Sequence, residues 1–196
     1  MAAHAMLTSK FPPSFNLYES QELANDISLM LCHGWSTFEI SASFEDEMLD
    51  NPMPDLPDRI EEVRAEYGRL VPEASADAQR IAALKQALEQ RDLFFSFDEE
   101  WDKADAAAEC AEKAEDAGNR GYVYCTNQDV DRLIHDGELY FGFSSMDAPG
   151  TDADIAIGEA LIDALKEVGF SPEWTGSTTA RVACSGLVFE LPLEDD

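Results

Sequence analysis

The sequence predicts an α+β protein in which a helical N-terminal segment precedes a mixed β-sheet with packed helices. Apolar residues recur at helical spacing up to about residue 90. From residue 93 onward, short aromatic or β-branched runs alternate with helical segments, which favours a sheet with crossover connections. The apolar fraction of 45% and the 11 phenylalanines supply a core, so disorder is not expected despite the charge.

Helix patterns fill most of the first ninety residues. Apolar residues at a spacing of four predict a helix from Ser20 to His33, with Gly34 as its C-terminal cap. Ser36–Glu39 has the capping-box pattern, which predicts a second helix to about Leu49. The remaining predictions for this region are a proline-rich connector at 51–57, a helix around 60–67 that ends within 68–72, and a helix at 76–90.

The second half predicts one sheet. Because strands and helices alternate from 93 to 175, we expect at least partly parallel pairing, with hairpins at the end of the chain. Phe141, Leu161 and Leu165 are expected in the core. The predicted strands are 93–97, 122–125, 139–143, 173–175, 180–184 and 187–191. The predicted helices are 98–117, 126–135 and 152–168.

These patterns divide the chain into four segments. Residues 1–16 are expected to be an irregular arm, because Pro12 and Pro13 block a helix there. A helical region at 17–91 and a sheet domain at 92–193 follow. Residues 194–196 form an acidic tail.

The charge limits the possible partners. With 41 acidic and 13 basic residues the net charge is −28, which argues against direct binding of nucleic acid or of an anionic membrane. It favours a basic protein as partner, or high solubility alone. No basic segment followed by an apolar stretch begins the chain, and no apolar run is long enough to span a bilayer, so a cytoplasmic location is expected.

No cofactor, metal site or catalytic residue is predicted. The cysteines at 32, 110, 125 and 184 have no metal-binding spacing, so we expect four reduced, buried thiols. The acids between Asp98 and Glu109 match part of a calcium-loop pattern, but Lys103 stands where that loop needs glycine. Cys125 and His135 lie on a predicted strand and the next helix, which implies no contact between them.

Part of the chain nevertheless resembles a known family. The residues that carry the resemblance are Gly121–Tyr124, Gln128–Asp129, Gly137–Phe143, Ile157–Gly158, Ala164–Gly169 and Glu173–Gly176. From about Ile81 to Cys184, and more weakly before Gly34, the chain is similar to a family of bacterial proteins described only as a domain of unknown function.

The resemblance implies a fold and no activity. Many members carry clustered cysteines and a histidine after the strand that corresponds to 93–97, whereas this chain has no cysteine there before Cys110. Members of the family often have another histidine at a position before Gln128, and the corresponding position in this chain lies near Thr126, where there is no histidine. Metal or thiol chemistry of relatives therefore does not transfer to this chain.

Two groups of residues are candidate binding sites. Thr126, Asn127 and Gln128 follow one predicted strand, Ser144 and Asp147 follow another, and the ends of strands commonly form ligand sites in α/β proteins. Helix capping is the alternative role for such residues, as packing is for Trp174, which precedes a tight turn. On the acidic helix, Glu112 and Asp116 are candidates for contact with a partner.

The leading functional prediction is a non-enzymatic interaction or regulatory module whose acidic surface meets a basic partner. A sharper version is mimicry of nucleic acid, in which carboxylates occupy a protein that binds DNA or RNA. The alternative is a small-ligand-binding protein or an enzyme with a polar site at the strand ends. The sequence names no partner, substrate or oligomeric state.

Overall fold

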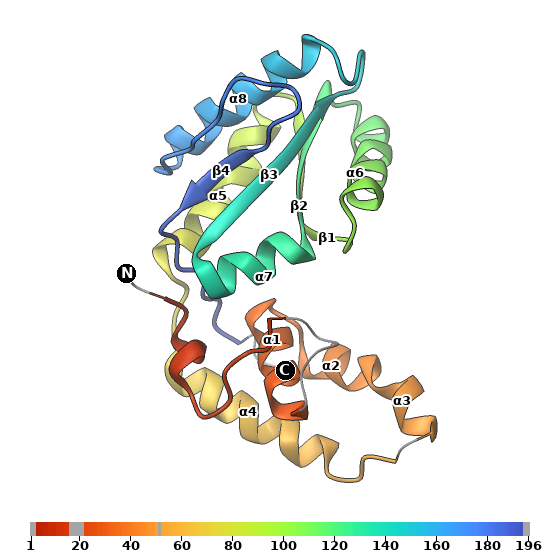
Figure 1. The fold of residues 1–196 in the computed structure, drawn as a ribbon, viewed down its shortest axis with the longest axis vertical. Coiled ribbons are helices and arrows are strands. Elements are labelled where there is room, and N and C mark those ends of the chain that lie inside the picture. Colours follow the sequence, from red (N-terminus) through yellow and green to blue (C-terminus); the bar gives the residue numbers. More distant parts are fainter. Residues whose placement is uncertain (1–2, 16–21, 51, 194–196) are drawn as a thin grey trace.

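The computed structural model describes residues 3–15, 22–50 and 52–193 and has the predicted α+β fold (Figure 1). Ser20, where the first helix was predicted to begin, and the acidic tail lie outside the described residues. The helices are η1 (Ala5–Thr8), α1 (Leu23–Cys32), α2 (Thr37–Ser43), α3 (Glu45–Asp50), α4 (Leu56–Leu70), α5 (Ala76–Glu89), α6 (Lys103–Ala117), α7 (Asn127–Asp136) and α8 (Ala153–Glu167). The strands are β1 (Leu93–Glu99), β2 (Gly121–Thr126), β3 (Glu138–Ser145) and β4 (Val182–Ser185).

The helical region differs from the prediction in two places. The capping box at Ser36 forms, but the single helix predicted to Leu49 is divided at Phe44 into α2 and α3. The hydroxyl groups of Ser41 and Ser43 donate to carbonyl groups earlier in α2, which competes with helix continuation. Helix α4 begins within the predicted connector, because a proline in its first turn loses no hydrogen bond there.

The sheet has the order β1-β2-β3-β4 and is mixed. Strands β1 and β2 are parallel, with α6 as their crossover, whereas β3 is antiparallel to both β2 and β4. The alternation of strands and helices thus predicted one parallel pair correctly and did not reveal the direction of β3. Helix α7 lies across the end of the sheet at which β2 ends (Figure 1). The chain therefore enters the sheet again from that end as β3.

Strand β1 extends beyond its predicted end. The helix predicted from Asp98 begins only at Lys103, because Asp98 and Glu100 have φ angles of +63° and +35°. Left-handed backbone at residues other than glycine interrupts both regular strand and helix. The turn between β1 and α6 is therefore a separate element. The acidic residues of this segment are typical of a helix N-terminus, so the sequence predicted a helix there instead.

The closing hairpins were predicted correctly only in part: the strand expected at 180–184 forms as β4, whereas 173–175 and 187–191 are not strands. Segments 173–175 and 180–184 meet in an antiparallel bridge between Glu173 and Ala183, and the strand that precedes β4 along the chain is β3, with α8 between them. Segment 187–191 has no strand assignment in the described structure; it leaves the sheet and runs to the helical region. There Ser75 N donates to Glu190 O (3.0 Å) and Tyr67 Oη donates to Leu191 O (2.8 Å).

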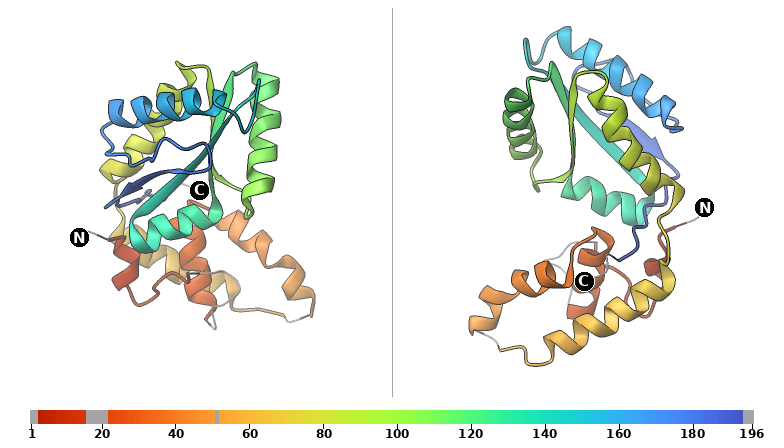
Figure 2. Two further views of the ribbon diagram at one scale, coloured as in Figure 1. Left: turned by 45° about the horizontal axis from the view of Figure 1, so that its top comes forward. Right: turned by 180° about the vertical axis from the view of Figure 1, so that it is seen from behind.

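Helices cover both faces of the sheet (Figure 2). Helices α5 and α8 pack on one face, α6 packs on β1 and β2 from the other, and α1–α4 lie beyond the end that α7 crosses. The predicted core residues Phe141, Leu161 and Leu165 are fully buried. One continuous core joins residues of the helical region to residues of the sheet. No described helix combines the length and apolar character that a membrane crossing needs.

Candidate functional site

Polar residues converge where the parallel strands β1 and β2 end and α7 begins. Thr126 is the N-cap of α7: its Oγ1 accepts from Asp129 N (3.3 Å) and donates to Asp129 Oδ2 (2.7 Å). Thr126 is only 1% exposed. This predicted ligand residue is therefore engaged in a buried capping box.

Asn127 and Gln128 hold the turn after β1. Asn127 Nδ2 donates to the carbonyl oxygen of Asp98 (2.9 Å) and to its Oδ1 (2.8 Å), while Asn127 N donates to Glu100 O (3.0 Å). Gln128 Nε2 donates to Trp101 O (3.1 Å). These bonds fix a turn whose left-handed residues cost about 1–3 kcal/mol each. Both predicted ligand residues thus stabilise this turn, and Gln128 is exposed.

His33 binds two carboxylates at the same end of the sheet. Its Nδ1 lies 2.7 Å from Asp98 Oδ2 and its Nε2 lies 2.9 Å from Asp131 Oδ1. The three side chains come from the end of α1, from β1 and from α7, and are between 5% and 16% exposed. We call this group the His33 clasp, because it joins the helical region to the sheet.

The His33 clasp has the electrostatics of a buried ion cluster. Burial lowers the pKa of His33, but hydrogen bonds and charge interactions with Asp131 and Asp98 outweigh it and raise the pKa to about 9. At neutral pH the ring is an imidazolium that donates from both nitrogens. It has no lone pair to act as a general base or as a metal ligand.

Ser144 and Asp147 lie at the opposite end of the sheet. Ser144 pairs with Tyr122, four residues before Thr126, which places the two about 13 Å apart along β2. Ser144 Oγ donates to Asp154 Oδ1 (3.1 Å), and Asp147 is exposed. Since β3 is antiparallel to β2, the structure does not bring the predicted polar strand ends into one cleft.

Trp174 packs against the sheet beside α8. Its ring meets Phe143 edge to face, with 5.6 Å between centroids, and it covers Gly158. Its Nε1 donates to the carbonyl oxygens of Ser177 (3.2 Å) and Ala180 (3.1 Å). These contacts are those of a half-buried packing residue whose polar atom is satisfied.

A second charged cluster, which the sequence analysis did not find, lies under α7. Arg181 Nη1 donates to Asp129 Oδ1 (2.9 Å) and its Nη2 donates to Tyr140 O (2.7 Å). The guanidinium carbon lies 6.0 Å from the ring centroid of Tyr124 and 5.9 Å from that of Tyr140. Arg181 and Asp129 are 52 residues apart, so no local spacing predicts the pair.

Among the described residues Cys32 contacts a histidine, but burial disfavours both the thiolate and the imidazolium of that pair. All four thiols are buried, which confirms Cys125 as a core residue, and burial raises the pKa of each. Cys32 Sγ lies 4.0 Å from Nδ1 of His4, whose pKa burial lowers to about 4. His135 instead contacts the carbonyl oxygens of Asp131 (2.8 Å) and Pro13 (3.2 Å).

Acidic residues surround a hollow of about 630 Å³ beside α6. It includes the predicted partner residues Glu112 and Asp116, which are one helical turn apart and exposed. The other residues that line it are Glu100, Asp105, Ala108, Glu109 and Lys113. We call this hollow the α6 groove.

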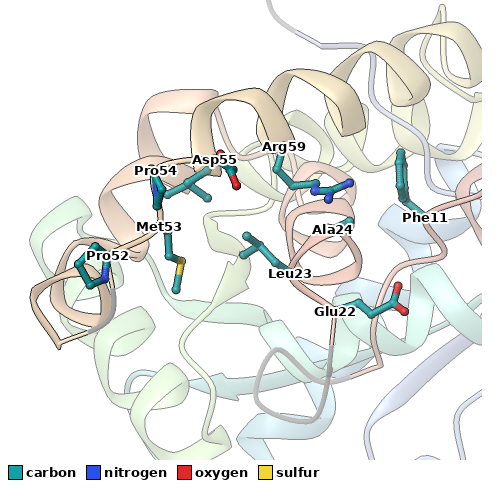
Figure 3. Close-up of a pocket in the computed structure, with 10 residues that line it drawn as sticks. Phe11, Glu22, Leu23, Ala24, Pro52, Met53, Pro54, Asp55 and Arg59 are labelled. Atoms are coloured by element: carbon teal, nitrogen blue, oxygen red, sulfur yellow. The ribbon is translucent and has the colours of Figure 1, made fainter.

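Another hollow, of about 590 Å³, lies between the N-terminal arm and the beginnings of α1 and α4 (Figure 3). Leu23, Met53 and Arg59 are among the side chains around it. Its lining is mixed, with the apolar side chains of Leu23 and Met53 beside the charged side chains of Glu22 and Arg59.

Comparison with known proteins places the chain at the level of a family. No curated protein and no solved structure matches it. A family model matches residues 19–189, a longer span than the resemblance that begins near Ile81. The chain belongs to the family described as domain of unknown function (DUF6891).

Proposed function

We propose that this protein is a non-enzymatic interaction module that binds a basic partner protein through the α6 groove. The observation that carries the proposal is the charge around this groove, where five carboxylates and one lysine surround a concave surface. An arginine or lysine side chain of a partner has the size and charge to enter it.

The single lysine does not neutralise the groove. Lys113 Nζ lies 2.7 Å from Glu99 Oε1 and 2.9 Å from Glu109 Oε1, and its hydrogen bond lowers the pKa of Glu109. Glu112 and Asp116 form no ion pair within the described part of the chain. Their carboxylates therefore stay available to an incoming cation, and the net charge of −28 accelerates its approach.

The alternative function, a small-ligand site or an enzyme at the strand ends, has less support. The polar atoms of Thr126, Asn127 and His33 are already engaged in hydrogen bonds within the chain. The groups at Ser144 and Asp147 lie at the other end of the sheet. Mimicry of nucleic acid remains a special case of the proposed function, in which the basic partner is itself a protein that binds DNA or RNA.

Charge reversal at two matched sites tests the proposal. The double variant Glu112→Lys with Asp116→Lys changes the groove, and Glu159→Lys with Asp163→Lys makes the same net change on exposed residues of α8, also four positions apart. Binding of a fluorescently labelled oligo-arginine peptide would be measured by anisotropy at low and at physiological salt.

The groove variant is expected to bind about tenfold more weakly, because two exposed ion pairs are worth about 1–2 kcal/mol together. The α8 variant should bind nearly as well as the unaltered protein. Equal losses in both variants would show that only the total charge attracts the peptide, which would refute the groove as the site.

A further inference from the structure

Strand β1 leaves one side of its backbone unpaired. It is the terminal strand of the sheet, and Arg120 N donates to Asp92 O (2.9 Å), which directs the carbonyl group of residue 92 toward β2. Since peptide groups alternate in direction along a strand, those of Leu93, Phe95 and Phe97 point away from β2; Leu93 is fully buried, so Phe95 and Phe97 present the accessible part of this edge. No residue in the described parts of the chain bonds to them there. An open edge of this kind is a template for another strand.

A hollow of about 540 Å³ runs along this edge. Four consecutive residues of β1, 94–97, line it. Successive side chains of a strand point to opposite faces, so a hollow that touches all four follows the strand edge rather than one face. The far wall comes from α5, through Ile81, Ala82 and Lys85, and from Phe189.

The walls of this hollow are mainly apolar. Phe95, Ile81 and Phe189 are each less than 10% exposed and form its floor. Lys85 is exposed at the rim, where its aliphatic stem extends the apolar wall. Side chains at alternate positions of an added strand would therefore meet an apolar surface, while its backbone met the free peptide groups of β1.

Charge at the two ends of β1 selects the occupant. Asp92 is exposed before the strand and Glu100 is exposed after it. A second copy paired antiparallel would bring these acids together between two chains that each carry a charge of −28. A strand with basic residues at its ends would instead find an acid at each end, in either direction.

We propose that the β1 edge binds an extended segment of a partner protein by strand addition, with apolar side chains in the middle and lysine or arginine at both ends. This site shares Glu100 with the α6 groove, but Ala82 belongs only to the β1 edge and the pair Glu112 and Asp116 belongs only to the groove. The two sites can therefore be tested independently.

The test uses a peptide in which valine and threonine alternate between two pairs of lysines. One control peptide carries glutamates in place of the lysines, and another carries N-methyl groups on alternate amides, which prevents strand pairing. The matched protein variants are Ala82→Trp, which fills the hollow, and Ala83→Trp, which lies on the next exposed position outside it. Binding is followed by calorimetry, and amide hydrogen exchange is measured at residues 95 and 97.

The lysine peptide should bind about tenfold or more tightly than the glutamate peptide and should slow exchange at these two amides. The N-methylated peptide should not bind, Ala82→Trp should abolish binding, and Ala83→Trp should leave it unchanged. Absence of binding, equal binding of the N-methylated peptide, or equal effects of the two tryptophans would overturn the proposal. A concentration-dependent dimer that Ala82→Trp dissociates would also overturn it, because the edge would then belong to a second copy.

Discussion

Deprotonation of His33 is expected to weaken the fold at mildly alkaline pH. The ring is held as an imidazolium between Asp98 and Asp131, with a pKa of about 9 in the folded protein against 6.5 as its ordinary value. Because the folded state holds the proton more tightly, its contribution to stability is complete below pH 6.5 and is lost as the pH rises through 9.

The size of the effect follows from the two pKa values. A difference of one pKa unit corresponds to about 1.4 kcal/mol, so the full contribution is about 3 kcal/mol. Between pH 7 and pH 8.5 the imidazolium accounts for a loss of about 1.5–2 kcal/mol in the free energy of unfolding. The buried thiols, whose pKa values are raised, add a loss in the same direction near pH 8.5.

Urea denaturation of the unaltered protein and of His33→Gln across pH 6.5 to 8.5 separates these contributions. The thiols titrate in both proteins, whereas only the unaltered protein carries the imidazolium, so the difference between their free energies of unfolding should narrow by about 2 kcal/mol over this pH range. Asp98→Asn offers a second measurement, because removal of one carboxylate should lower the pKa of His33 in an NMR titration. The ionic form of the His33 clasp would be refuted by two results together: a difference in the free energy of unfolding between the two proteins that does not change with pH, and an NMR pKa of His33 near 6.5.

Four further predictions concern the core, the packing and the charge. Leu165→Ala should lower the free energy of unfolding by about 2–5 kcal/mol in urea denaturation, because the side chain is fully buried; a loss near zero would contradict that position. Gly158→Ala should cost about 1–3 kcal/mol, because its new Cβ would lie 2.6 Å from Trp174 Cη2; the cost should shrink when Trp174 is also replaced by alanine, and an unchanged cost would exclude this contact as its cause. The pKa of His4 is lowered to about 4, so stability should fall as the pH decreases from 6.5, and His4→Gln should reduce this fall; an equal acid response of both proteins would argue against a neutral buried ring. Added sodium chloride should raise the melting temperature, because it screens repulsion among 41 acids; a flat response in calorimetry would show that the acids are too far apart to repel.

Local signals predicted most of the helices and strands. The apolar spacing of α1 and α5 and the capping residue of α7 depend only on neighbours within one or two turns, so the sequence shows them directly. The turn at Asp98 was missed because acidic residues also favour a helix N-terminus, and a left-handed φ leaves no signal in a residue other than glycine. Segment 187–191 reads as a strand by composition, yet its partners are Ser75 and Tyr67, far away in the sequence.

The sequence by itself determined the fold class, the apolar positions of the core and the strong acidity, since each depends on composition or on short-range periodicity. Only the tertiary structure decided which polar residues meet. The direction of β3 moved Ser144 away from Thr126, and the position of the end of α1 next to the end of the sheet brought His33 to Asp98 and Asp131, which are 65 and 98 residues further along the chain. Strand direction and long-range docking arise from burial summed over the whole core, and no local spacing of residues encodes that sum.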